Sequence, residues 1–240
     1  MKRFHIAYLY YDILNLYGEN GNIKALKKNL ELENINTCIH FLTVDDELEF
    51  DKYDLVYMGA GTENNQKIIL PHLLKYKKEI KKAISDGKFF LITGNAINLF
   101  GKYILKGKNK EKTLEVFDYY VKEESFRMID ESIMKCSFLN DFVIGFQNQN
   151  TVLRDNKNPM FEVVKGIGSY PNSKTEGIKY NNFYGTYLVG PLLIRNPEFL
   201  KYFINEIMKK NNLKYKKLDL KMEEKAYNAF TNNFYKEYIK

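Results

Sequence analysis

The feature that most constrains the fold is an alternation of short apolar runs with helix-like segments over the first hundred residues. Two of the runs, YDLVYMGAG at 53–61 and KFFLIT at 88–93, are almost continuously apolar, as strands buried on both faces are. Further strand candidates lie at 3–10 and 35–44, and apolar residues recur at helical spacing in 22–34 and 68–87. This order is typical of a three-layer α/β/α domain with a mainly parallel sheet.

The rhythm changes near residue 113, where short strand candidates follow one another between clusters of Asn, Asp, Gly and Pro. These candidates are 113–121, 125–129, 132–138, 141–149, 160–165 and 182–190. Two helices are expected after them, at 196–210 and 218–239, the first opening on Asn-Pro. We expect one α/β domain over 1–205 with a strand-rich second half, and a C-terminal helical extension packed on it over 206–240.

Length and composition are those of a globular cytoplasmic protein. The chain has 240 residues, of which 45% are hydrophobic and 28% charged, enough for one main core. Its longest apolar stretches are far shorter than the roughly 20 residues that span a bilayer, and we expect no membrane span. Cys38 and Cys136 lack the spacing of a disulfide framework or a zinc site, so plain buried thiols are expected, with no metal and no cofactor.

The net charge of +7 raises the question of a polyanionic partner. Lysines are interleaved with acids along most of the chain, whereas a nucleic-acid footprint needs clustering on one surface. The local excess is at the end, where residues 201–240 carry ten Lys against five acids. Nucleic acid is therefore not favoured, and a basic polyanion-binding protein stays open as an alternative.

Ligand sites of parallel sheets lie beyond the carboxyl ends of the strands, and segments at those ends carry a resemblance. The segments are YDILNLYGENGNIKALKKNLE at 11–31, VYMGAGTENNQ at 56–66, GFQNQ at 145–149 and YGTYLVGPLLIRNPEFL at 184–200. They resemble the glutamine amidotransferase subunits of bacterial lipid II isoglutaminyl synthase, a cobyric-acid-synthase-like branch of the class I amidotransferases. The match runs in order through almost the whole chain and implies a flavodoxin-like class I amidotransferase fold.

The two catalytic side chains of that family are replaced in this chain. Family members carry a cysteine at a strand-to-helix elbow and a histidine in a GTYLHGPLL stretch; the corresponding places here are Gly94 and Val189. Glutamine hydrolysis needs a thiolate to attack the amide and an imidazole to move the proton, and glycine and valine supply neither. We expect Gly94 at the elbow, facing Val189 and the turn Gly59-Ala60-Gly61.

The resemblance also implies roles for residues around this pocket. In the family the glycine-rich turn supplies oxyanion donors, which matches Gly59, Ala60 and Gly61, and Asn95 of the TGNA corner is placed in the same pocket. Arg127 matches an arginine that binds the carboxylate of glutamine, although a surface arginine on a strand is the alternative.

Two glutamines complete the comparison with the family. Gln66 could line the pocket or be a helix-start or solvated side chain, and Gln149 stands where the family often has histidine.

The resemblance implies a degenerate amidotransferase subunit without glutaminase activity. Its expected partner is a Mur-ligase-like, ATP-dependent enzyme that amidates lipid II, and glutamine or a related small molecule is a candidate ligand. Two alternatives stay open: an active amidotransferase that uses an unrecognised nucleophile, and the basic polyanion-binding protein.

Overall fold

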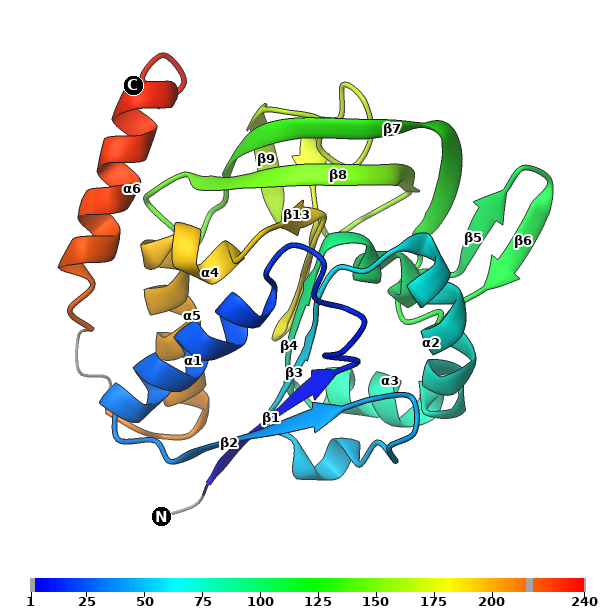
Figure 1. The fold of residues 1–240 in the computed structure, drawn as a ribbon, viewed down its shortest axis with the longest axis horizontal. Helices are drawn as coiled ribbons and strands as arrows, with labels where there is room; N and C mark the ends of the chain where they lie inside the picture. The colour runs from blue at the N-terminus through cyan, green and yellow to red at the C-terminus, as the bar shows by residue number, and fades with distance from the viewer. Residues whose placement is uncertain (1–2, 215–217, 240) are drawn as a thin grey trace.

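Two β-sheets with helices on their faces make up the computed structural model, which describes residues 3–214 and 218–239 (Figure 1). The first sheet has the order β11-β12-β4-β3-β1-β2. Its strands are β1 (Phe4–Leu9), β2 (Thr37–Leu42), β3 (Leu55–Met58), β4 (Phe89–Thr93), β11 (Ile178–Tyr180) and β12 (Phe183–Thr186). All neighbours in it are parallel except β11 and β12, so the expected mainly parallel sheet is confirmed.

Helices cover both faces of this sheet, which gives the expected three layers. On one face lie α1 (Asn20–Leu32), α4 (Leu192–Arg195) and α5 (Pro197–Lys210), and on the other α2 (Glu63–Lys75) and α3 (Lys77–Ser85) (Figure 1). Every residue of β3 and β4 is buried, because apolar clusters press on them from both sides. The continuous apolar runs of the sequence are therefore the central strands.

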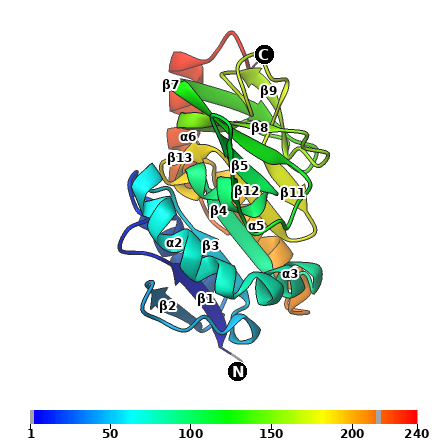
Figure 2. The same cartoon turned by 90° about the vertical axis from the view of Figure 1, so that its right-hand side faces the viewer.

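The second sheet holds the strand-rich half and lies above the first in Figure 2. Its order is β10-β9-β7-β5-β6, with β8 paired to β7 and β13. The strands are β5 (Tyr103–Lys106), β6 (Asn109–Lys112), β7 (Tyr120–Lys135), β8 (Val143–Arg154), β9 (Phe161–Lys165), β10 (Thr175–Glu176) and β13 (Leu188–Val189). Its pairs are antiparallel apart from β5 with β7.

Three details of the sequence-based expectations are wrong. The candidates 125–129 and 132–138 are not separate strands: residues 125–129 and 132–135 belong to the single strand β7, because pairing with β8 continues past the irregularity between Glu123 and Met128. Residues 136–138 follow the end of that strand. The hairpin β5–β6, which turns at Gly107 with a φ of 58°, was not expected. The single helix expected over 68–87 is two helices, α2 and α3, which meet at Tyr76.

The C-terminal part packs on the second sheet. The helix α6 (Lys221–Phe234) places Tyr227 near β8, where its hydroxyl donates to the Phe142 carbonyl over 2.7 Å. Tyr227 and Tyr235 share an apolar cluster with Ile133 and Ile144. The boundary proposed between residues 205 and 206 falls inside α5. None of the helices in the described residues has both the length and the apolar character needed to cross a membrane.

Candidate functional site

The carboxyl ends of β12, β4 and β3 lie side by side in the first sheet, as the sequence predicts. The chain leaves β4 at Thr93 and turns at Gly94 into η2, a 3-10 helix over Gly94–Phe100. Gly94 has a φ of +63°, in the left-handed region that glycine adopts without the penalty of a side chain. Gly94 is therefore at the strand-to-helix elbow, as expected.

The space next to Gly94 is filled. A Cβ atom on Gly94 would lie 2.5 Å from the Ala60 Cβ and 2.8 Å from the Val189 Cγ1, both too short for real contacts. Val189 is buried on β13, where it pairs with Phe146 of β8. These contacts confirm that Gly94 faces Val189 and the turn after β3, and they leave no room for a nucleophile's side chain.

The turn Gly59-Ala60-Gly61 is bound to the elbow by an amide side chain. The Gly61 N–H donates to Asn95 Oδ1 over 3.2 Å, and Asn95 Nδ2 donates to the Gly61 carbonyl over 2.7 Å. The Gln66 side chain donates to the Asn95 carbonyl over 2.5 Å. At least one candidate oxyanion donor is thus already engaged, and Gln66 fastens α2 to the elbow.

Glu19 is the residue of this region that the sequence reasoning missed. It lies at the start of α1, fully buried, and accepts hydrogen bonds from Tyr57 Oη at 2.6 Å, Thr93 Oγ1 at 2.5 Å and the Gly190 N–H at 3.2 Å. It thereby joins the ends of β3, β4 and β13. The sequence does contain a signal that could have identified Glu19. It is an acid between Gly18 and Gly21, in the loop that follows the first strand at the carboxyl edge of the sheet.

Burial sets the electrostatics of Glu19. Desolvation raises the pKa of its carboxyl, and the hydrogen bonds from Thr93, Tyr57 and Gly190 oppose that rise. The pKa of the Tyr57 hydroxyl is well above its ordinary value, first through burial and then through the nearby Glu19 charge. Because Thr93 Oγ1 donates to Glu19, the proton of its hydroxyl is already engaged by an acceptor within the chain.

Arg127 lies at the edge of the same region, on β7. Its Nη2 is 2.6 Å from Glu63 Oε1 at the start of α2, and its Nη1 donates to Asn148 Oδ1 over 3.0 Å. The side chain is 42% exposed. The guanidinium that the resemblance assigns to a substrate carboxylate is here paired with a carboxylate of the chain itself.

Gln149 is buried on β8 and donates to the Thr151 carbonyl over 3.1 Å. It is part of the hydrogen bonding within the strand-rich half. Among the described residues, the His, Cys, Asp and Glu side chains with metal-ligand spacing lie on β1 and β2, away from this elbow.

The CobB/CobQ-like glutamine amidotransferase domain matches residues 5–197 of the sequence. The chain belongs to this family. Solved amidotransferases share the fold: one from Thermotoga maritima has a TM-score of 0.53 at 12% identity, over 97% of this chain and 95% of its own. A second glutamine amidotransferase has a TM-score of 0.56 at 14% identity, over 84% of this chain and 98% of its own. These likenesses confirm the fold expected from the resemblance.

Two curated relatives in the amidotransferase family cover most of the chain. The lipid II isoglutaminyl synthase (glutamine-hydrolyzing) subunit GatD of Staphylococcus aureus is 28% identical over 229 residues, 94% of each chain. The subunit of the same name from Streptococcus pneumoniae is 28% identical over 212 residues, 87% of this chain and 82% of its own. The resemblance to these subunits that the sequence indicated is confirmed.

Within this family, the chain turns from β4 into η2 at Gly94, and the side chains nearest to Gly94 are apolar. The described side chains in contact with Gly94 offer a methyl group from Ala60 and an isopropyl group from Val189, and the preceding Thr93 hydroxyl donates to the Glu19 carboxyl. None of these can form an acyl-enzyme and pass a proton to a leaving amine as a thiolate and imidazole do.

Proposed function

We propose that this chain is a non-hydrolysing amidotransferase subunit that serves the amidation of the peptidoglycan precursor lipid II. The observation that supports it is the turn at Gly94, where the space that a side chain would need is taken by Ala60 and Val189. The family resemblance assigns the nucleophile to this same position. The two curated relatives support the pathway, because both are named as subunits of lipid II isoglutaminyl synthase.

The partner in this proposal is a cytoplasmic Mur-ligase-like, ATP-dependent enzyme. A subunit without a nucleophile can still dock to its ligase, hold it in a stable form, or bind glutamine without hydrolysing it. Gly59, Ala60, Gly61 and Asn95 then form the wall of the former oxyanion region, while Arg127 and Gln66 stand at its entrance. For Arg127 to bind a glutamine carboxylate, the Glu63 carboxylate has to give way.

The second candidate is an active amidotransferase with a displaced nucleophile, and Cys38 is the residue to consider because two histidines lie beside it. Cys38 is on β2, separated from β4 by β1 and β3, so about 14 Å of sheet lies between them at ordinary strand spacing. Cys136 is half-buried, and burial raises the pKa of its thiol to about 11. Neither thiol favours glutaminase chemistry at the elbow.

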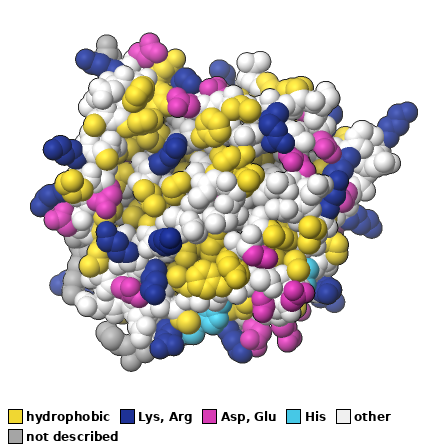
Figure 3. Space-filling view, viewed as in Figure 1, with side chains coloured by type: hydrophobic (Ala, Val, Ile, Leu, Met, Phe, Trp, Pro, Cys, Tyr) yellow, Lys and Arg dark blue, Asp and Glu magenta, His cyan; other side chains and the backbone are white. Residues whose placement is uncertain are grey.

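The face of the described residues drawn in Figure 3 does not favour a polyanion-binding function. On the face drawn in Figure 3, the Lys and Arg side chains are scattered among Asp and Glu. Several lysines are paired with acids, such as Lys201 with Glu224 and Lys209 with Glu206 at the C-terminal end.

The test is a reconstitution with the Mur-ligase-like protein of the same genome. We expect a stable complex that amidates lipid II with free ammonia and not with glutamine, because losing a nucleophilic unit lowers turnover by roughly a million-fold. The Staphylococcus aureus subunit with its own partner is the positive control. A glutamine-analogue electrophile should leave the mass of this chain unchanged.

Glutamine-driven amidation at an ordinary rate would contradict the proposal. If that activity survived Cys38→Ser and Cys136→Ser, the nucleophile would have to be a group other than a thiol. If Cys38→Ser alone abolished it, the second candidate would be the correct one.

A further inference from the structure

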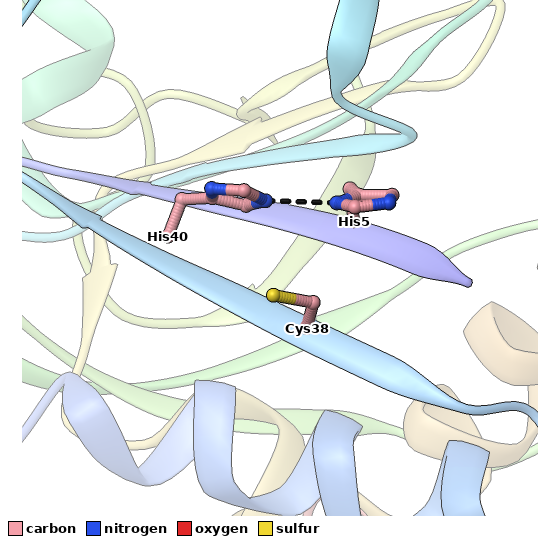
Figure 4. Close-up of side chains that lie close together, drawn as sticks. All are labelled: His5, Cys38 and His40. Carbon is pink, nitrogen blue, oxygen red and sulfur yellow. Dashed lines mark hydrogen bonds between the residues drawn. The ribbon is translucent and has the colours of Figure 1, made fainter.

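Three side chains that could bind a metal ion lie on the edge strand β2 of the first sheet and on its neighbour β1, away from the elbow. His5 of β1 is the register partner of Cys38 of β2, and His40 stands two residues further along β2. Since side chains alternate between the faces of a strand, all three project from the same face. Figure 4 shows the two imidazoles pointing toward each other and the Cys38 thiol beside them. We call these three residues the edge cluster.

The atoms of the edge cluster are already close together. His5 Nδ1 and His40 Nε2 are 2.8 Å apart, and one ligand atom from each of the three residues lies within 4.8 Å of the others. All three side chains are half-buried, and Cys38 is a free thiol. The two imidazoles share one hydrogen bond. One of the two facing nitrogens carries the proton, and which one it is depends on the tautomers.

Two contacts hold the edge cluster in place, one at the backbone of His5 and one at the ring of His40. Asp54 Oδ2 accepts a hydrogen bond from the backbone N–H of His5 over 2.8 Å, at the end of the loop that leads into β3. The Tyr53 ring packs on His40, with ring centroids 5.4 Å apart. The nearby Lys52 is paired with Glu49 over 2.6 Å, so a carboxylate accompanies that positive charge.

This donor set matches the preferences of borderline-soft transition metals. Zn²⁺ takes imidazole nitrogen at about 2.0–2.1 Å and thiolate sulfur at about 2.3 Å, which places tetrahedral ligand atoms roughly 3.3–3.7 Å apart. The two ring nitrogens would have to separate by about half an ångström and the thiol to approach by at most about an ångström. Mg²⁺ and Ca²⁺ prefer oxygen ligands, and the cluster offers none.

We propose that His5, Cys38 and His40 bind one transition-metal ion of the Zn²⁺ class, with a fourth position open to water. On binding, the Cys38 thiol loses its proton to solvent. The imidazole that donates the shared hydrogen bond changes tautomer, so that its proton moves by exchange with solvent to its other ring nitrogen, and both facing nitrogens then bind the metal. The ion ties the edge strand β2 to β1. It therefore stabilises the folded chain by an amount that grows with the logarithm of its concentration once that concentration exceeds the dissociation constant.

The test uses the full-length protein and Co²⁺ as a spectroscopic probe, with Zn²⁺ as competitor. We expect one Co²⁺ per chain, a thiolate-to-cobalt charge-transfer band, and displacement of that band by Zn²⁺. Cys136→Ser is the matched control, because Cys136 is the chain's other half-buried free thiol and lies outside the edge cluster. It should keep the band, whereas Cys38→Ser should lose it and bind Zn²⁺ at least about a hundred-fold more weakly.

A second measurement needs no substitution. Zn²⁺ should protect Cys38 and not Cys136 from alkylation in the unmodified protein, with the modified residue located by peptide mass. His40→Gln should abolish this protection. The proposal is overturned if Co²⁺ gives no thiolate band, if the band survives Cys38→Ser, or if Zn²⁺ leaves the alkylation of Cys38 unchanged.

Discussion

The elbow and the edge cluster lie in the same parallel sheet and have opposite characters. At the elbow, Gly94 is enclosed so closely that a single added Cβ would be 2.5 Å from Ala60. At the edge, His5, Cys38 and His40 are half-buried and carry the imidazole and thiol groups that the elbow lacks. The turn at Gly94 therefore has apolar neighbours, whereas the imidazole and thiol groups lie at the edge of the sheet.

This difference indicates that the turn after β4 is held by buried contacts and hydrogen bonds within the chain. The ends of β3, β4 and β13 are held together by the buried Glu19 carboxyl, which accepts hydrogen bonds from Tyr57, Thr93 and Gly190, and this network needs no substrate. Satisfied buried polar groups specify one arrangement of the chain around them. Substitutions at the elbow and at the residues around it test this difference between the two regions.

The largest expected effect is a gain of reactivity when the elbow is rebuilt. We expect Ala60→Gly/Gly94→Cys/Val189→His to form a covalent adduct with a glutamine-analogue electrophile. Ala60→Gly removes the atom nearest to the new Cβ, and the histidine supplies a base where Val189 offers only a methyl group. The triple variant should react about 10²–10⁴-fold faster than Ala60→Gly/Gly94→Cys, the usual range for a general base.

Adduct formation is followed by intact mass, with circular dichroism to check that each variant is folded. Gly94→Cys alone and Val189→His alone should both remain unreactive. Equal reactivity of the variants with and without histidine would mean that the place of the base has been assigned to the wrong residue.

The next effect is on stability. Gly94→Ala should lower the free energy of unfolding by about 2–5 kcal/mol, because a side chain in the left-handed region costs about 1–2 kcal/mol and overpacking a further 1–3. Ala60→Gly should recover part of the overpacking when the two are combined. Urea unfolding of the two single variants and the double variant gives their coupling energy, and purely additive effects would contradict the contact between these two positions.

The sequence predicted the layers, the central strands and the position of Gly94, because these follow from local patterns. Continuous apolar runs identify β3 and β4, and a small-residue corner after β4 identifies the elbow. The proximity of Val189 to Gly94 was predicted through the family resemblance, since more than ninety residues of chain separate them and no local pattern joins them.

The parts that the sequence did not predict depend on tertiary pairing. Glu19 reads as an ordinary loop acid until β3, β4 and β13 surround it with donors. The edge cluster needs the parallel register that sets His5 opposite Cys38, although the two-residue step from Cys38 to His40 already placed those two on one face. The length of β7 likewise depends on its partner β8, because pairing carries the strand past its local irregularity.

A second buried acid, Glu176, should make the stability of the protein depend on pH. Glu176 of β10 is fully buried and accepts hydrogen bonds from Thr186 Oγ1 and the Tyr187 N–H, each over 2.7 Å. Burial raises the pKa of its carboxyl from 4.5 to about 7. The native state then holds a proton that the unfolded state releases, so stability falls as the pH rises from about 4.5 to 7.

Replacing this acid should remove its share of the fall. We expect Glu176→Gln and the unmodified protein to be similarly stable near pH 4.5, and the variant to gain up to about 3 kcal/mol over it by pH 7.5. Urea unfolding at both pH values measures the difference. Glu237→Gln, at an exposed carboxylate, is the control and should follow the unmodified protein. Parallel pH profiles for Glu176→Gln and the unmodified protein would show that Glu176 titrates normally.

The smallest expected effect is at the entrance of the elbow, where Arg127 meets Glu63. Both side chains are more than a third exposed, so their ion pair should contribute only about 0.2–1 kcal/mol and weaken with added salt. A double-mutant cycle of Arg127→Ala and Glu63→Ala by urea unfolding measures the coupling energy. A small coupling energy leaves Arg127 free to exchange Glu63 for a ligand carboxylate, as the proposed binding of glutamine without hydrolysis requires. A coupling energy well above 1 kcal/mol would mean that Glu63 holds Arg127 too strongly for a ligand carboxylate to replace it. The expected contrast between the closely packed elbow and an exchangeable ion pair beside it would then fail.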